Sequence, residues 1–147
     1  MDEIPQRKWL RHEAPDWVNS GAVFFVTINA RPRGTEALLG EAGKAVISTA
    51  QFYHEKRVWW LRLVMVMPDH LHLLVSFPEE VAMKEQIRKF KAYLRRTISI
   101  DWQAGFFDHR LRNEAAIEEK WHYVMMNPVR AGLVDSPEKW ALHWRPR

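Results

Sequence analysis

The sequence contains no cysteine. A disulfide framework and a thiolate zinc site are therefore excluded, and any metal ion must be held by histidine, carboxylate or amide groups. The sequence also lacks an apolar run of about eighteen residues, which a membrane-spanning helix would need, and it does not begin with the basic and then apolar pattern of a signal peptide. We therefore expect a cytoplasmic protein without a membrane partner. Candidate metal ligands are confined to the seven histidines and their neighbours.

The chain length allows one domain with a sizeable core. The 147 residues are too few for two domains of ordinary size. Hydrophobic residues make up 47% and charged residues 27%, a balance typical of a soluble globular protein. We expect a single domain over 1–147, with an N-terminal extension over about 1–20 and a C-terminal tail over 135–147.

The net charge is only mildly positive, at +4, but its distribution is uneven. Acidic residues gather in 1–16, 36–41 and 114–119, whereas basic residues dominate 84–96 and 110–112. A local basic surface suits a polyanion such as nucleic acid. The charge alone is equally compatible with an ordinary solvated surface.

The hydrophobic pattern predicts a β-α-β-β-α-β order followed by one more helix. Segment 23–29 is rich in β-branched and aromatic residues, as a buried strand requires, and 36–56 repeats apolar positions every three or four residues, as an amphipathic helix does. The predicted elements are, in chain order, a strand over 23–29, a helix over 36–56 capped by Thr35, strands over 58–67 and 70–77 joined by a short Pro68-Asp69 turn, a helix over 79–98, a strand over 105–111, and a helix from 113 to about 127. This order is the ferredoxin-like α+β plan, an antiparallel sheet with two helices on one face, to which the last helix is added.

Two histidines lie in the third predicted strand. His70 and His72 are two residues apart, so both imidazoles point to the same side of the sheet, where they can share a metal ion. The pattern is weak by itself, because paired strand histidines are often only polar surface residues. A metal site here needs a third ligand.

The last predicted helix offers a candidate ligand and a candidate nucleophile. Tyr123 lies away from the apolar stripe of that helix and one turn before Asn127. Asn127 presents a neutral amide oxygen to a cation, or it simply caps the helix before Pro128. Tyr53 continues the apolar stripe of the first predicted helix and Tyr93 lies beside that of the second, so packing explains both better than catalysis does.

Three ordered blocks of the sequence are similar to a known family. They are Met67-Pro68-Asp69-His70-Leu71-His72-Leu73-Leu74-Val75, then Trp102-Gln103 with Gly105-Phe106-Phe107-Asp108-His109-Arg110-Leu111-Arg112, then Tyr123-Val124-Met125-Met126-Asn127-Pro128-Val129-Arg130-Ala131-Gly132-Leu133-Val134. On these motifs the chain resembles the REP-associated tyrosine transposases, relatives of the IS200/IS605 transposases within the Y1 group of HUH single-strand endonucleases. The resemblance covers nearly the whole chain, and the run that starts at Asn127 is its most specific part.

The resemblance implies a role for each candidate site residue. His70 and His72 would be the metal-binding pair, Tyr123 the nucleophile, and Asn127 the third ligand of a divalent ion, Mg²⁺ or Mn²⁺. Imidazole ligation suits Mn²⁺ better than Mg²⁺, and an amide as third ligand makes zinc a weaker choice. The insertion-sequence transposases usually carry Gln in the third place, so Asn127 places this chain with the REP-associated branch.

The resemblance also implies an activity and a partner. We expect cleavage of single-stranded DNA through a 5′-phosphotyrosine intermediate that leaves a free 3′-hydroxyl, so that a second DNA end can be joined. The DNA would be REP palindromes, recognised as imperfect hairpins. The insertion-sequence relatives are dimers that share active sites, whereas the REP-associated proteins resemble monomers, so we expect a monomer.

The candidate DNA-binding residues are basic side chains in two groups. One group recurs at steps of four, three and four on the second predicted helix, where it either tracks a DNA backbone or forms an ordinary solvated face. The other group flanks the matched blocks, where it either holds phosphates near the site or, in a structural role, pairs with Asp108 or Glu114. The two groups are Lys84, Arg88, Lys91 and Arg95, and Arg110, Arg112 and Arg130.

Two other functions compete with this one. The first is a non-catalytic ferredoxin-like nucleic-acid binder that uses sheet aromatics such as Phe24 and Phe25. The second is a metal nuclease that activates water and forms no covalent adduct. The first leaves the histidines, Tyr123 and Asn127 unexplained as a set.

Overall fold

The computed structural model describes residues 22–78 and 82–147. One antiparallel sheet runs through this part of the chain, with strand order β4-β1-β3-β2-β5. The strands are β1 (Val23–Asn29), β2 (Trp60–Val66), β3 (His70–Ser76), β4 (Phe107–Leu111) and β5 (His143–Trp144). The helices are α2 (Glu41–Glu55), α3 (Met83–Ile98), α4 (Glu114–Met125), α5 (Asn127–Arg130) and the 3-10 turn η1 (Pro137–Lys139).

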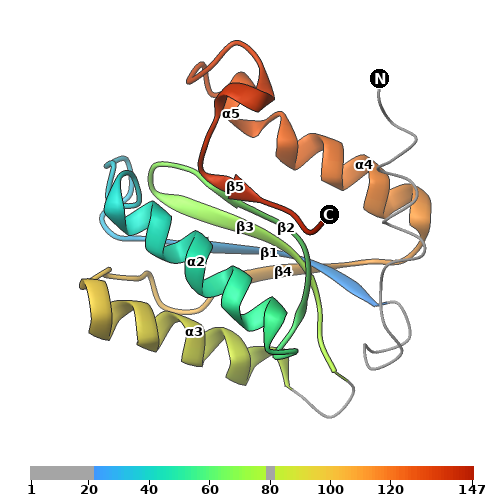
Figure 1. The fold of residues 1–147 in the computed structure, drawn as a ribbon, viewed down its shortest axis with the longest axis horizontal. Helices are drawn as coiled ribbons and strands as arrows, with labels where there is room; N and C mark the ends of the chain where they lie inside the picture. Colours follow the sequence, from blue (N-terminus) through green and yellow to red (C-terminus); the bar gives the residue numbers. More distant parts are fainter. Residues whose placement is uncertain (1–21, 79–81) are drawn as a thin grey trace.

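Helices cover both faces of the sheet (Figure 1). Alternate residues of a strand point to opposite faces, and β3 shows the consequence. Leu71 and Leu73 pack in the core that α2 and α3 cover, whereas Leu74 belongs to the core beneath α4. His70 and His72 share the even-numbered positions of Leu74, so they point to the α4 face.

The predicted fold class is confirmed. The first four strands and α2 and α3 follow the expected β-α-β-β-α-β order, and α4 is the extra helix that carries Tyr123. Part of the predicted C-terminal tail over 135–147 belongs to the sheet, because β5 pairs with β2 as a fifth strand. The predicted N-terminal extension over about 1–20 lies outside the described residues.

The first helix begins later than predicted. It starts at Glu41 rather than at residue 36, and Thr35 does not cap it. Gly40, with φ of 68°, takes a left-handed conformation immediately before the helix. Leu38 is fully buried and its backbone N–H donates to the carbonyl of Pro68, so core packing holds this segment in a turn.

The other helix boundaries are close to those predicted. Helix α3 begins at Met83, whereas the sequence predicts a start at residue 79. Residues 79–81 lie outside the described part of the chain. Asn113 caps α4, because its side chain accepts a hydrogen bond of 2.8 Å from the N–H of Ala116. Helix α4 ends at Met125, and Asn127 is the first residue of α5 rather than a cap. None of the helices in the described ranges combines the length and the apolarity needed to cross a membrane.

Candidate active site

A cavity of about 540 Å³ lies between the sheet and the C-terminal end of α4. Its walls include both histidines of β3, the tyrosine and a lysine of α4, and two residues of α5. These residues are His70, His72, Lys120, Tyr123, Asn127 and Arg130. The fold thus brings the predicted metal pair, the predicted nucleophile and the predicted third ligand to one place.

Asp69 holds the imidazole of His70. The ring centroids of His70 and His72 are 4.8 Å apart, and the Nδ1 of His70 is 2.9 Å from a carboxylate oxygen of Asp69. Burial alone would raise the pKa of Asp69, but hydrogen bonds from Arg33, His70 and the N–H of Gly34 hold that pKa well below its usual range. The carboxylate is therefore ionised and can only accept, so Nδ1 of His70 donates to it and the ring is oriented with Nε2 turned away from Asp69.

Thr27 of β1 holds the imidazole of His72. The Oγ1 of Thr27 is 3.0 Å from Nδ1 of His72, and the two residues are direct partners across β1 and β3. Burial, together with the neighbouring His70 and the positive charges of Lys120 and Arg130, lowers the pKa of His72 to about 3. At neutral pH His72 is therefore an uncharged imidazole, the form that ligates metal ions.

Two cations flank the ring of Tyr123, which is 51% exposed. The guanidinium carbon of Arg130 lies 3.7 Å from the ring centroid, and Nζ of Lys120 lies 4.9 Å from it. Lys120 also stands 4.7 Å from the ring of Phe25, which stacks on His72 at 5.0 Å. An anionic group in the cavity would therefore meet two positive charges beside the hydroxyl-bearing ring.

The side chain of Asn127 is hydrogen-bonded to Arg130. Its Oδ1 accepts a hydrogen bond from Nη2 of Arg130, which also donates to the backbone carbonyl of Tyr123 at 2.8 Å. An amide oxygen has two lone pairs, so this bond leaves one of them for a cation. Arg130 thus fixes both the position of Asn127 and the end of α4.

The donor set fits a divalent metal ion. Within residues 22–78 and 82–147, no three His, Asp or Glu side chains gather in a metal-binding group, and the amide oxygen of Asn127 is a candidate donor beside the two histidines of the cavity. Both histidines have Nδ1 held by another residue, the arrangement that orients a ligating imidazole through its second nitrogen. Two neutral imidazoles and one amide oxygen leave further positions for water or phosphate oxygens.

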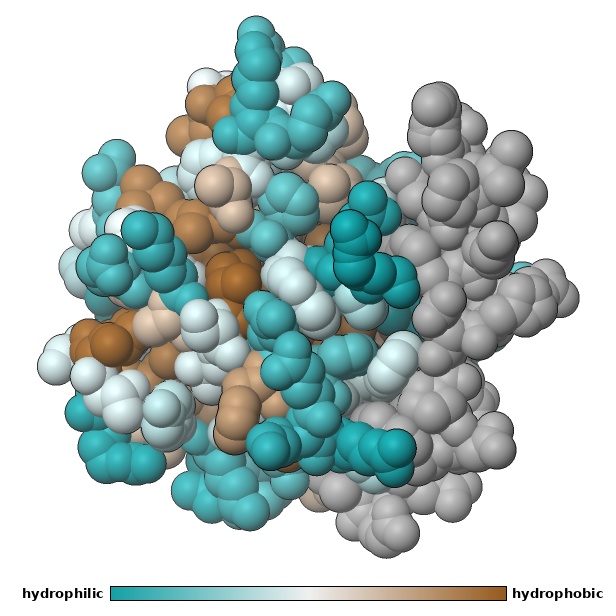
Figure 2. All heavy atoms as spheres, viewed as in Figure 1, coloured by the Kyte–Doolittle hydropathy of each residue, from teal (hydrophilic) through white to brown (hydrophobic). Residues whose placement is uncertain are grey.

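The basic residues of α3 lie together, but not in this cavity. Lys84, Arg88, Lys91 and Arg95 line a separate groove of about 280 Å³ next to Gly105 and Phe106. Figure 2 shows mainly hydrophilic residues over α3, on the face of the molecule turned to the viewer. Helix α3 covers the face of the sheet opposite α4, so this groove and Tyr123 are on opposite sides of the sheet.

Two residues of the basic stripe already have protein partners. Lys91 donates to the backbone carbonyls of Gln103 at 2.9 Å and Gly105 at 2.7 Å, and burial lowers its pKa. Arg88 forms an ion pair with Glu85. Among residues 22–78 and 82–147, Lys84 and Arg95 are the stripe residues without a hydrogen-bond or ion-pair partner of this kind.

The three arginines expected near the site do not all lie in the cavity. Arg130 lines the cavity, whereas Arg110 and Arg112 do not. Arg110 pairs with Phe24 across β4 and β1, and Phe24 packs in the core under α2 and α3. Directly paired residues point to the same face, so Arg110 lies on the α3 side of the sheet.

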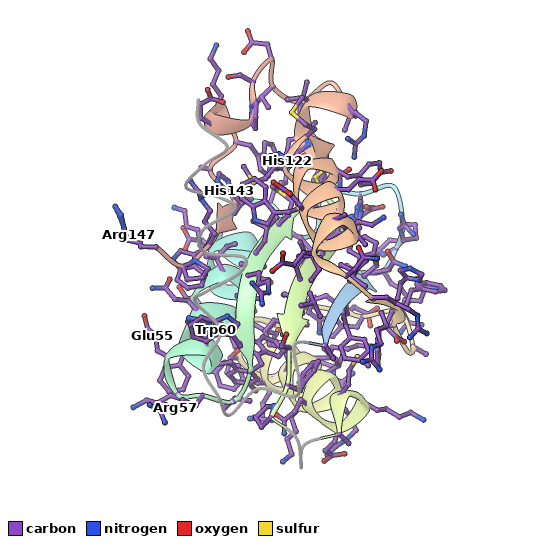
Figure 3. All side chains as sticks on the ribbon, turned by 90° about the vertical axis from the view of Figure 1, so that its right-hand side faces the viewer. Glu55, Arg57, Trp60, His122, His143 and Arg147 are labelled. Atoms are coloured by element: carbon purple, nitrogen blue, oxygen red, sulfur yellow. The ribbon has the colours of Figure 1, made fainter. Side chains whose placement is uncertain are left out.

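The other tyrosines and histidines of the described residues do not line the cavity. Tyr53 packs against Trp59 at 5.0 Å, whereas Tyr93 is 43% exposed and is less buried than a core residue would be. Tyr93 lies instead in a groove between α2 and α3. Figure 3 labels His122 on α4 and His143 on β5, and neither lines the cavity that contains Tyr123.

The sequence reasoning missed Lys120, Asp69 and Thr27 as members of this site. Lys120 lies one helical turn before Tyr123, and that spacing was the available signal. Asp69 directly precedes the histidine pair but was interpreted only as a turn residue. No local signal in the sequence indicates Thr27, because it meets His72 only through the pairing of two distant strands.

Comparison with known proteins gives consistent matches. Residues 27–114 match the family described as "Transposase IS200 like". A REP-associated tyrosine transposase of Escherichia coli K12 is 25% identical over 126 residues, which cover 82% of this chain and 74% of that protein. A relative of the same description from Haemophilus influenzae is 26% identical over 140 residues, covering 82% of this chain and 77% of the relative.

Two solved structures share the fold. A REP-associated tyrosine transposase bound to a REP hairpin superposes with a TM-score of 0.73 at 22% identity, covering 88% of this chain and 80% of that one. A transposase from Deinococcus radiodurans superposes with a TM-score of 0.52 at 12% identity, covering 75% of this chain and 93% of that one. The resemblance stated from the sequence motifs is confirmed.

Proposed function

Because the chain belongs to the IS200-like transposase family, we propose that it is a metal-dependent, single-strand-specific DNA endonuclease and strand transferase that acts through Tyr123. Membership of this family implies an enzyme that cleaves DNA. The observation that carries the proposal is the cavity in which a tyrosine from α4 meets two oriented histidines from β3. Fifty residues of chain separate these groups, so their meeting is a product of the fold.

Tyr123 is the proposed nucleophile. Its Oη attacks the scissile phosphorus, the bond from phosphorus to the 3′-oxygen breaks, and the DNA remains attached to the enzyme as a 5′-phosphotyrosine. The phenol gives up its proton and the departing 3′-oxygen gains one. Because the phosphotyrosine bond keeps the energy of the cleaved linkage, a 3′-hydroxyl of a second DNA end can attack it and release Tyr123.

Lys120 and Arg130 are proposed to hold the phosphate. Both cations flank the ring of Tyr123, so a phosphate placed for attack by its hydroxyl lies within their field. His72 stays neutral beside them, and with its proton on Nδ1 facing Thr27, Nε2 would be its ligating nitrogen. The side chains thus divide into a metal-binding group from β3 and a phosphate-binding group from α4 and α5.

His70, His72 and Asn127 are proposed to hold a divalent ion, Mg²⁺ or Mn²⁺. Such an ion supplies charge stabilisation to a non-bridging phosphate oxygen. Asp69 and Thr27 fix the two imidazoles for this role, and Arg130 fixes Asn127.

The proposed DNA is a single strand that carries a REP-type hairpin. The similarity to a transposase bound to a REP hairpin supports this substrate. The basic groove of α3 is a candidate surface for the hairpin stem. The histidine pair and Tyr123 of one chain already share one cavity, which supports action as a monomer.

A denaturing gel of the protein with labelled single-stranded hairpin DNA tests the proposal. We expect a covalent protein–DNA adduct with the native protein and with Tyr93→Phe, and none with Tyr123→Phe, which should bind the DNA as well as before. Tyr93→Phe is the matched control because Tyr93 is similarly exposed but lies between α2 and α3.

Other results would support the competing functions. Metal-dependent cleavage without an adduct would indicate a nuclease that activates water. Binding without cleavage would indicate a nucleic-acid binder, although Phe24 and Phe25 point to opposite faces of the sheet and cannot form one binding surface.

A further inference from the structure

Phe107 is an exposed aromatic residue at the edge of the sheet. Its 63% exposure is the highest among the large hydrophobic side chains of the described residues. It is the first residue of β4, an edge strand of which only Leu111 is buried. A phenylalanine on a regular strand has little freedom to fold its ring away from water, so the exposure is a property of the position.

Strand register places Phe107 in line with the candidate active site. Thr27 of β1 is paired with Phe107 on one side and with His72 on the other. Directly paired residues point to the same face, so Phe107, Thr27 and His72 form one row across three strands. Two strand spacings separate the Cα atoms of Phe107 and His72 by roughly 10 Å.

Beyond Thr27, the residues that surround Phe107 on this face include aromatic and basic side chains. His109, two residues further along β4, is exposed and pairs with Phe25, the ring on which Lys120 stands. Asp108 alternates to the opposite face. Exposed aromatic rings beside cations are the features with which proteins bind unpaired nucleotides, because every base can stack on a ring.

We propose that Phe107 is a stacking platform for an unpaired base of the DNA strand whose phosphate lies beside Tyr123. This inference rests on the proposed function and adds to it a binding site for a nucleotide that flanks the cleaved bond. The charged residues of β4, Asp108, Arg110 and the adjacent Arg112, disfavour the other occupant of an exposed edge strand, a second copy of the chain.

DNA binding in a Tyr123→Phe background tests the platform without interference from cleavage. The probe is a single strand with a foldable palindrome and an unpaired flank. We expect Phe107→Ala to weaken binding about tenfold, the size of one lost base–aromatic stack, and Phe107→Trp to restore it. The slope of affinity against salt should not change, because no charge is removed. Phe52→Ala is the matched control, since Phe52 is 54% exposed on α2.

An abasic nucleotide moved along the unpaired flank identifies the stacked base. At one position the abasic substitution should weaken binding with Phe107 present and have little further effect in Phe107→Ala. Native affinity in Phe107→Ala would overturn the platform, and so would a loss that Phe52→Ala reproduces. A dimer in sedimentation that Phe107→Ala dissociates would overturn it in favour of a second copy.

The failure of the platform is distinguishable from failure of the proposed function. An adduct with the native protein, together with unchanged binding by Phe107→Ala, rejects only the platform. Absence of any adduct, together with weakened binding by Phe107→Ala, rejects the cleavage chemistry and keeps the stacking site.

Discussion

Asp69 connects the histidine pair to the turn that follows β1. Its two carboxylate oxygens accept from Nδ1 of His70 on one side and from Arg33 and the N–H of Gly34 on the other. The carboxylate is only slightly exposed and holds three donors, so it fixes the imidazole of His70. Asp69 is therefore a positioning residue for the proposed metal site.

Asp69→Asn should weaken metal binding without removing a ligand. A neutral amide is a poorer acceptor for Nδ1–H of His70, and the loss of such a partner typically costs at least about tenfold in metal affinity. We expect the Mn²⁺ concentration for half-maximal cleavage to rise by about that factor, with nearly the same rate at saturating Mn²⁺. Titration of cleavage against Mn²⁺, with direct calorimetry of Mn²⁺ binding, measures both quantities.

Asp101→Asn is the control for this substitution. It also removes one carboxylate, from an exposed ion pair with Arg31 at 3.0 Å that does not touch the histidines. An equal rise in both variants would show a general effect of charge and would contradict the positioning role of Asp69.

Helix α3 is the element for which the structure refines the sequence interpretation most. Its four stripe residues line one groove, but Lys91 donates a hydrogen bond to the backbone carbonyl of Gly105, just before β4, and Arg88 forms an ion pair with Glu85. The four basic residues of α3 are therefore not equally available for contacts with phosphates. Lys84 and Arg95 are the residues best placed to neutralise phosphates.

Replacing Lys84 and Arg95 by alanine should weaken DNA binding alike for all sequences. Each lost phosphate contact should flatten the slope of log affinity against log salt by about 0.7 on single strands or 0.9 on a duplex stem. Binding measured at several salt concentrations checks this expectation. Lys44 of α2 and Lys56, the residue that caps its C-terminal end, replaced together, are the control for net charge. An unchanged slope in Lys84→Ala/Arg95→Ala would return the stripe to a solvated face.

At the scale of the whole molecule, the sheet separates the basic groove from the cavity of Tyr123. Helix α3 lies on one face and α4 on the other (Figure 1). The groove reaches Gly105 and Phe106, immediately before β4. A DNA that contacts both sites can pass over the β4 edge, where Phe107 lies. On this proposed path the stem would lie on the α3 side of the edge and the unpaired strand on the α4 side.

Substrate form tests this arrangement. We expect cleavage of a single strand with a foldable palindrome, weak cleavage when the stem is scrambled, and little cleavage of the same sequence as a perfect duplex, because a duplex cannot expose an unpaired flank at β4. Initial rates on the three DNAs at one salt concentration decide between them. Equal rates on duplex and single strand would contradict single-strand specificity, and equal rates with and without the stem would contradict the use of the hairpin.

Several features were determined by the sequence alone, because neighbouring residues carry them. The strand over 23–29, the hairpin at Pro68 and Asp69, and the common side of His70 and His72 follow from period-two geometry and turn chemistry. The exposure of Tyr123 follows from its place outside the apolar stripe of its helix. These are local properties, and the family motifs fall on the same segments.

Only the tertiary structure decided which distant segments meet. The pairing of β1 with β3 places Thr27 on His72, and the packing of α4 on the sheet places Lys120 over Phe25. The core position of Leu38 delays the start of α2, and β5 joins the sheet although its two residues are too few to give a strand pattern. The tertiary structure also decided that α3 and Tyr123 lie on opposite faces of the sheet. Each of these depends on how the two faces of one sheet are covered, and no window of neighbouring residues contains that information.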